Sequence, residues 1–188
     1  RKKKKKDKDG NIIPDRTPKQ RKNNIKFTFA RYMFAFIREG FGDLPVWKIA
    51  AAQRGMTDDN LIHSTNYKYL DEKGEILDME GFQVSLGPLA LPINLRATRN
   101  STLVTITWDD SRDNPSAAPT DRMMVGIFYA NYRDTFTLEK ETGTTRRDGK
   151  CEITLRNDDG EVCIHPFFAR ADNTAFSEDK AITLPDTE

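Results

Sequence analysis

Over the last hundred residues, apolar side chains recur at every second position in short runs that turn-forming residues separate. The clearest run places Val104, Ile106 and Trp108 on one side and Leu103 and Thr105 on the other. Such alternation indicates half-buried β-strands. We expect strands near 81–86, 91–98, 102–109, 123–131, 134–140, 150–156, 161–169 and 176–184. Short strands at this spacing are typical of an antiparallel β-sandwich of the fibronectin or immunoglobulin type, with Trp108 between its two sheets.

A long helix is predicted upstream of these strands. Thr17 can accept at the N-cap, Pro18 suits the first helical position, and Gln20 completes a capping box. The helix is expected to run to about Glu39, with Gly40 as a left-handed C-cap.

A second helical region is predicted over 46–52 and 58–70, where Trp47 and Leu61 would anchor the core. The chain therefore has an α+β organisation, in which a helical N-terminal region precedes the antiparallel sandwich. We divide it into a basic arm (1–16), a helical assembly region (17–87) and a fibronectin-like sandwich (88–188).

The long helix carries two apolar faces. One face holds Ile25, Phe29, Tyr32, Met33 and Phe36. The other holds three phenylalanines at intervals of seven residues, namely Phe27, Phe34 and Phe41. A helix with two apolar faces needs two covers. The second cover is either the segment 47–69 folding back or another subunit, and we predict that Phe27, Phe34 and Phe41 form the interface of a homo-oligomer.

The charge of the chain is unevenly distributed. Residues 1–26 carry a net charge of +9, and the rest of the chain carries −8. The basic residues of this segment are Arg1, Lys2, Lys3, Lys4, Lys5, Lys6, Lys8, Arg16, Lys19, Arg21, Lys22 and Lys26. A basic arm on an acidic body is typical of a polyanion-binding tail, although a solubilising tail has the same composition. These twelve residues are the predicted polyanion-binding site.

No residue pattern predicts catalysis, and none predicts a metal or a cofactor. The chain contains no Gly-rich phosphate loop, Gly-x-Ser-x-Gly elbow or His-Glu-x-x-His sequence. Cys163 and His165 share a strand face, but a zinc site needs three or four ligands. A carboxylate cluster (Asp109, Asp110 and Asp113) fits turn chemistry as well as calcium binding. We therefore expect no enzyme activity.

The sequence also bears on the compartment. It has no run of about 18 apolar residues, so no membrane span is predicted. A polar stretch over 7–16 stands where a signal peptide would be apolar. The two cysteines, Cys151 and Cys163, are expected to be free thiols, which favours a cytoplasmic or assembly-associated location.

Short motifs resemble a known family. Arg16-Thr17-Pro18-x-Gln20-Arg21, an aromatic helix, Ser85-x-Gly87-x-Leu89 and Trp108 follow one another along the chain. This order is similar to an abundant family of Bacteroidetes proteins to which no activity is assigned. The resemblance implies a fold and a lineage, but no activity.

The stretch 167–177 resembles the region between the last two strands of fibronectin type III modules. It departs from that pattern because the tyrosine expected early in the preceding strand is absent from 161–165. The function expected is that of a non-enzymatic structural or protein-interaction protein in a larger assembly. The alternative is binding of nucleic acid or another polyanion through residues 1–26.

Overall fold

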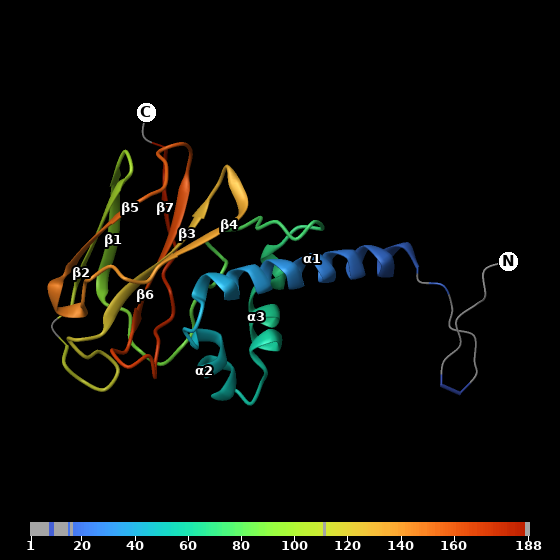
Figure 1. Cartoon of the computed structure of the whole chain (residues 1–188), viewed down its shortest axis with the longest axis horizontal. Helices are drawn as coiled ribbons and strands as arrows, with labels where there is room; N and C mark the ends of the chain where they lie inside the picture. The colour runs from blue at the N-terminus through green and yellow to red at the C-terminus, as the bar shows by residue number, and fades with distance from the viewer. Residues whose placement is uncertain (1–7, 10–14, 16, 111, 187–188) are drawn as a thin grey trace.

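The computed structural model describes residues 8–9, 15, 17–110 and 112–186 (Figure 1). Helices come first in the chain and two antiparallel sheets follow, so the α+β prediction is confirmed. The helices are α1 (Pro18–Phe41), α2 (Val46–Ala52) and α3 (Asp58–Asn66), with short 3-10 turns at η1 (Tyr67–Tyr69) and η2 (Arg146–Asp148). The strands are β1 (Ile93–Asn100), β2 (Leu103–Asp109), β3 (Arg122–Tyr129), β4 (Tyr132–Glu139), β5 (Lys150–Thr154), β6 (Val162–Ala169) and β7 (Ile182–Leu184).

The strands form one sheet in the order β1-β2-β5 and a second in the order β4-β3-β6-β7. Residues from both sheets share one apolar core, to which Trp108 of β2 and Phe168 of β6 contribute an edge-to-face ring pair. The Trp108 side chain is buried, and its Nε1 donates a hydrogen bond of 2.8 Å to the carbonyl of Arg146. The expectation that Trp108 lies in the core is confirmed.

Two expected strands are wrong or shorter than predicted. The segment 81–86 forms no strand, because side chains satisfy its backbone: Asn66 bonds both the N–H and the carbonyl of Gln83 at 2.8 Å. Of the strand expected over 176–184, only Ile182–Leu184 forms a regular strand, and Phe176 makes an isolated bridge. The other six expected strands are present with shifts of one or two residues at their ends.

Helix α1 begins as predicted and ends later. Thr17 and Gln20 form the reciprocal capping box. The helix continues through Gly40 to Phe41, and the residue at its end with a positive φ, of 59°, is Gly42. Gly40 instead provides space, because a Cβ at this position would lie 2.8 Å from Cδ1 of Phe136 in β4.

A second core lies between the helices and the four-stranded sheet. It joins Ile37 and Phe41 of α1 to Phe128, Phe136 and Phe167 of the sheet. The sheet β4-β3-β6-β7 is therefore covered on both faces, and residue 88 does not separate two independent cores.

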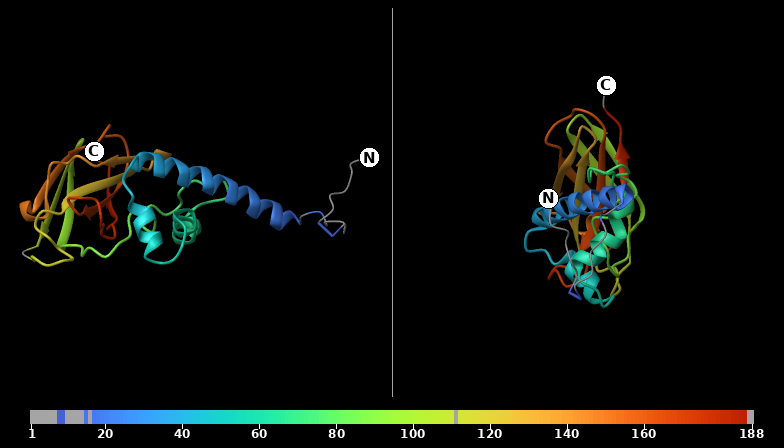
Figure 2. Two further views of the ribbon diagram at one scale, coloured as in Figure 1. Left: turned by 60° about the horizontal axis from the view of Figure 1, so that its bottom comes forward. Right: turned by 90° about the vertical axis from the view of Figure 1, so that its right-hand side faces the viewer.

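The first half of α1 extends away from the rest of the molecule (Figure 2). No residue of α1 before Ala30 is buried. In the described part of the chain, no helix has the length and apolar character needed to cross a membrane.

Candidate interaction surface

An apolar stripe runs along the open side of α1. It consists of Ile25, Phe29, Tyr32 and Phe36, whose side chains are between 40% and 69% exposed. Their spacing of four, three and four residues keeps them on one side of the helix. We call these four residues the outer stripe. Large exposed apolar side chains grouped on one face indicate a surface that another molecule covers.

The residues predicted to form the interface are not part of the outer stripe. Phe34 and Phe41 are buried within the chain, so the prediction that they form a subunit interface is wrong. The ring of Phe34 contacts His63 of α3 and Phe82, and that of Phe41 contacts Phe136. The segment after α1 folds back over this face, which is the alternative that the sequence left open.

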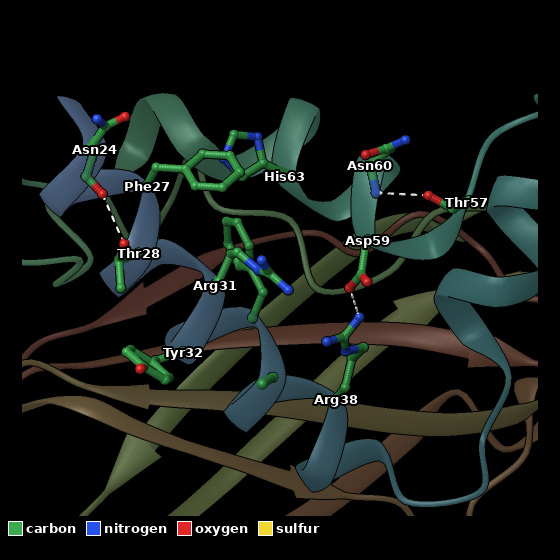
Figure 3. Close-up of a pocket in the computed structure, with 12 residues that line it drawn as sticks. Asn24, Phe27, Thr28, Arg31, Tyr32, Arg38, Thr57, Asp59, Asn60 and His63 are labelled. Atoms are coloured by element: carbon green, nitrogen blue, oxygen red, sulfur yellow. Dashed lines mark hydrogen bonds and ion pairs between the residues drawn. The ribbon is translucent and has the colours of Figure 1, made fainter. Parts of the chain in front are cut away.

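Phe27 is in an intermediate position. Its side chain is 45% exposed, and its ring centroid lies 4.8 Å from that of His63 (Figure 3). The His63 ring also stacks on Tyr67 at 4.5 Å. Burial among these rings lowers the pKa of His63, so this imidazole is neutral at pH 7.

A groove of about 920 Å³ separates α1 from α3 beside the outer stripe (Figure 3). Asn24, Thr28, Arg31 and Tyr32 of α1 line one wall, and Asn60 and His63 of α3 line the other. At one end of the groove, Arg38 pairs with the Asp59 carboxylate at the start of α3. The groove therefore presents polar and aromatic groups beside the apolar stripe.

The predicted polyanion-binding residues are only partly described. Arg1, Lys2, Lys3, Lys4, Lys5, Lys6 and Arg16 lie outside the described residues. Lys8 is exposed, and Lys19, Arg21 and Lys22 are exposed on the first turns of α1. Lys22 pairs with Glu72, and the Lys26 ammonium lies 4.6 Å from the centre of the Tyr67 ring. Between Pro18 and Arg38, α1 contains no acidic residue.

A buried Cys–His–Asp arrangement links β6 to the loop before β7. The Cys163 sulfur lies 3.4 Å from Nε2 of His165, and Nδ1 of His165 lies 2.7 Å from Oδ2 of Asp179. Burial opposes charge on His165, but its hydrogen bonds to Asp179 and Cys163 outweigh that effect and raise its pKa to about 9.

The order of these groups matches that of a nucleophile, a base and an orienting carboxylate. All three side chains are nevertheless inaccessible to solvent or nearly so. The other oxygen of Asp179 accepts hydrogen bonds of 2.9 Å from the backbone N–H groups of Val84 and Ser85. The arrangement therefore clamps the segment 84–85 onto the sheet. The prediction that Cys163 and His165 share a strand face is confirmed, and both are more buried than expected.

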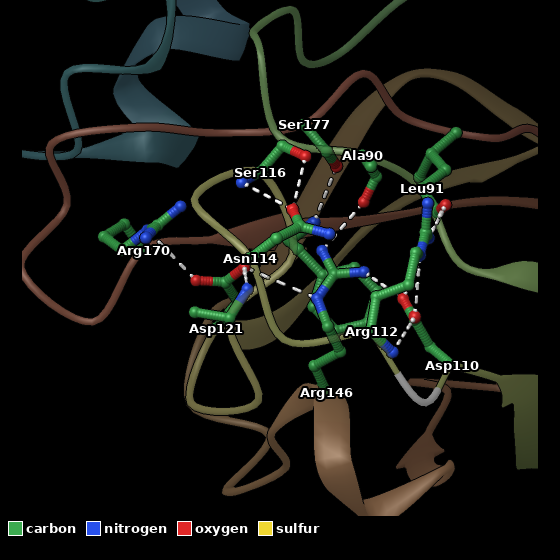
Figure 4. A network of polar contacts seen from close by, with 12 residues as sticks. Ala90, Leu91, Asp110, Arg112, Asn114, Ser116, Asp121, Arg146, Arg170 and Ser177 are labelled. Atoms are coloured by element: carbon green, nitrogen blue, oxygen red, sulfur yellow. Dashed lines mark hydrogen bonds and ion pairs between the residues drawn. The ribbon is translucent and has the colours of Figure 1, made fainter.

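A second buried polar cluster closes one end of the two sheets (Figure 4). The Arg146 guanidinium lies 2.5 Å from Oδ2 of Asp110, within ion-pair distance of Asp121, and 4.1 Å from the centre of the Phe168 ring. Burial opposes ionisation of Asp110, but hydrogen bonds from Arg112 and Arg146 lower its pKa to about 2. Both Asp110 oxygens are thus bonded to arginine side chains. Oδ1 of Asp110 also accepts a hydrogen bond of 3.1 Å from the backbone N–H of Arg112, which is the turn role expected from the sequence.

Comparison with protein-family models gives no match, and comparison with curated proteins gives none at significant similarity.

Proposed function

We propose that this chain is a non-enzymatic assembly protein that docks on another protein through the outer stripe of α1. The observation that carries the proposal is the position of the stripe on a helix that extends beyond the body (Figure 2). In the same proposal, the two sheets form a fibronectin-like sandwich that acts as the scaffold for α1. The chain is further proposed to belong to the Bacteroidetes family that its motifs resemble.

Helix physics supports this function. Three turns of helix without tertiary contacts are only marginally stable in water. The first three turns of α1 bury no residue, and they are held by a capping box and by the contacts of Lys22, Lys26 and Phe27. Packing of Ile25 and Phe29 against a partner would bury apolar surface and stabilise these turns, at about 25 cal/mol per Å².

A second candidate is polyanion binding through residues 1–26. The net charge of +9 on this segment favours it, as does the absence of acidic residues from 18–38. Exposed lysines and arginines on a projecting helix would contact phosphates without reading base sequence.

The test of docking uses the tagged full chain in cells that naturally make it. The size of the particle containing the chain is measured in native extracts by gel filtration. We expect wild-type chain in a complex larger than the chain itself, and Ile25→Ser/Tyr32→Ser at the size of the free chain.

Ile93→Ser/Tyr132→Ser is the matched control, because Ile93 and Tyr132 are exposed side chains of the same types on the sheets. This control should elute with wild type. Wild-type chain that elutes as a free monomer from native extracts would overturn the proposed function.

A further inference from the structure

We propose that the occupant of the outer stripe is a second copy of this chain, bound antiparallel through its own α1. This inference rests on the proposed function and adds the partner and the geometry. In the antiparallel pair, a two-fold axis passes between Phe29 and Tyr32. The basic end of each α1 then lies beside the body of the other copy.

The spacing of the stripe sets the register. Steps of four, three and four residues from Ile25 to Phe36 are the alternating steps of a heptad seam. In an antiparallel pair, Phe29 faces Tyr32 of the second copy, and Ile25 faces Phe36 of the second copy. Each aromatic ring thus meets a large apolar side chain, and the whole stripe is covered by its own equivalent.

Charge decides between the antiparallel and parallel orientations. One heptad step before Phe29 is Lys22, and one step after Tyr32 is Glu39. The antiparallel register places Lys22 opposite Glu39 of the second copy, twice per dimer. A parallel pair would place Lys22 against Lys22 and would align the basic first turns with each other, which is unfavourable.

The existing contacts of these two residues leave them available. Glu39 has no ion-pair partner in the part of the chain that the structure describes. Lys22 pairs with Glu72, but both side chains are about 60% exposed, and such surface pairs contribute little. Glu39 and Asp43 are exposed where α1 meets the body. In the antiparallel pair, these acidic groups would lie beside the basic first turns of the second copy's α1.

The surface beside the stripe has room for a helix. Thr28 and Ala35 are small residues on one flank, next to the groove in front of α3. On the other flank, a hollow of about 300 Å³ lies between Phe29, Phe36 and the loop 73–75. A second helix seated on the stripe would place its side chains in these two depressions.

Nucleic acid suits this face less well. Base stacking would use Phe29 and Tyr32, but Ile25 offers no stacking surface. Asp58 and Asp59 lie near Arg38, and Glu39 would repel phosphates. Nucleic-acid binding that depends on the outer stripe would contradict the proposed dimer.

The test measures the mass of the purified full chain by sedimentation velocity up to about 100 μM, a range that detects dimers with micromolar Kd. We expect a concentration-dependent dimer for wild type and for Ile93→Ser/Tyr132→Ser. Ile25→Ser/Tyr32→Ser should raise the Kd at least about tenfold while its circular dichroism remains that of wild type.

Charge reversal tests the orientation. Lys22→Glu and Glu39→Lys should each weaken the dimer, and the double variant should restore it. Lys22→Glu also faces Glu72 in its own chain, so restoration by the second substitution is the deciding result. If the losses of dimer affinity from the two reversals simply add in the double variant, the antiparallel register is wrong.

Disulfide formation gives an independent readout. A mixture of Phe29→Cys and Tyr32→Cys chains should form mixed disulfide dimers, because these positions face each other only in the antiparallel register. The native Cys151 and Cys163 are buried and do not compete.

Wild-type chain that stays monomeric at about 100 μM would overturn this inference. A stripe variant that lost nucleic-acid binding and still formed the dimer would also overturn it. The proposed function would then still stand if native extracts showed a stripe-dependent complex with a different protein. If the extracts showed only monomer, both would fail.

Discussion

His165 and Asp179 are buried and bonded to each other at 2.7 Å, Nδ1 to Oδ2. His165 lies on β6, and Asp179 also binds the backbone of Val84 and Ser85. One carboxylate therefore connects the sheet to the segment that leads from the helices. Because the segment 81–86 has no strand partner, this connection replaces part of the missing ladder.

The His165 clamp should make stability depend on pH in the alkaline range. The pKa of His165 in the folded chain is raised to about 9 from 6.5. A raised pKa contributes stability that is complete below about 6.5 and is lost as pH rises through 9. We expect the free energy of unfolding to fall by about 3 kcal/mol between pH 6 and 10. Urea titrations across this range measure it.

His165→Gln is the comparison variant, because its amide can still bond Asp179 but does not titrate. It should be less stable than wild type at pH 6, and its stability should change less between pH 6 and 10. An equal pH dependence in both proteins would assign the effect to other groups.

Arg146 should be far more important for stability than its neighbour Arg147. Arg146→Met leaves Asp110 and Asp121 buried without their shared cation. Removing one partner of a buried ion pair typically costs about 3–5 kcal/mol. Arg147 is exposed, so Arg147→Met should cost less than about 0.5 kcal/mol. Thermal and urea unfolding of the two variants compare these costs, and similar values would place Arg146 outside the core.

Local signals in the sequence predicted the start of α1 correctly. Thr17, Pro18 and Gln20 act within one turn, so no distant residue is needed to read them. Local signals could not predict which apolar face of α1 is buried, because that depends on where α3 and the sheet lie. Phe34 is buried by Phe82 and His63, which are 48 and 29 residues away in the sequence. The three- and four-residue spacing of the outer stripe was visible in the sequence, but it did not show which of the two apolar faces of α1 stays exposed.

The buried polar clusters were not predictable for the same reason. Asp110 and Arg146 are separated by 36 residues, and each is ordinary in its own segment. The sequence predicted that Cys163 and His165 share a strand face, because side chains two residues apart on a strand point to the same side. Asp179 could not be added, since the loop that carries it is fixed by contacts with 84–85.

The sheets should not form a fully native structure without the helices. Residues 88–188 alone would expose Phe128, Phe136 and Phe167, which the helices and the segment 76–86 now cover. We expect this fragment to bind a hydrophobic dye and to unfold at lower urea concentration than the chain 17–188. A fragment with the stability of the longer chain would show that the shared core contributes little. Fluorescence of the bound dye and urea unfolding make the comparison.

The basic arm should bind polyanions in a salt-dependent way. The basic arm (1–16) and the first turns of α1 up to residue 26 together carry +9, so binding through several of these charges releases counterions and weakens steeply as salt rises. We expect random single-stranded oligonucleotides to bind the full chain at low salt, as measured by fluorescence anisotropy. The affinity should not depend on base sequence.

Deletion of 1–16 removes the arm and leaves α1 capped by Thr17, so this variant should bind much more weakly and remain folded. Ile25→Ser/Tyr32→Ser should bind like wild type, because polyanion contacts use the arm and not the outer stripe. Equal binding by the full chain and the shortened chain would identify the arm as a solvated tail.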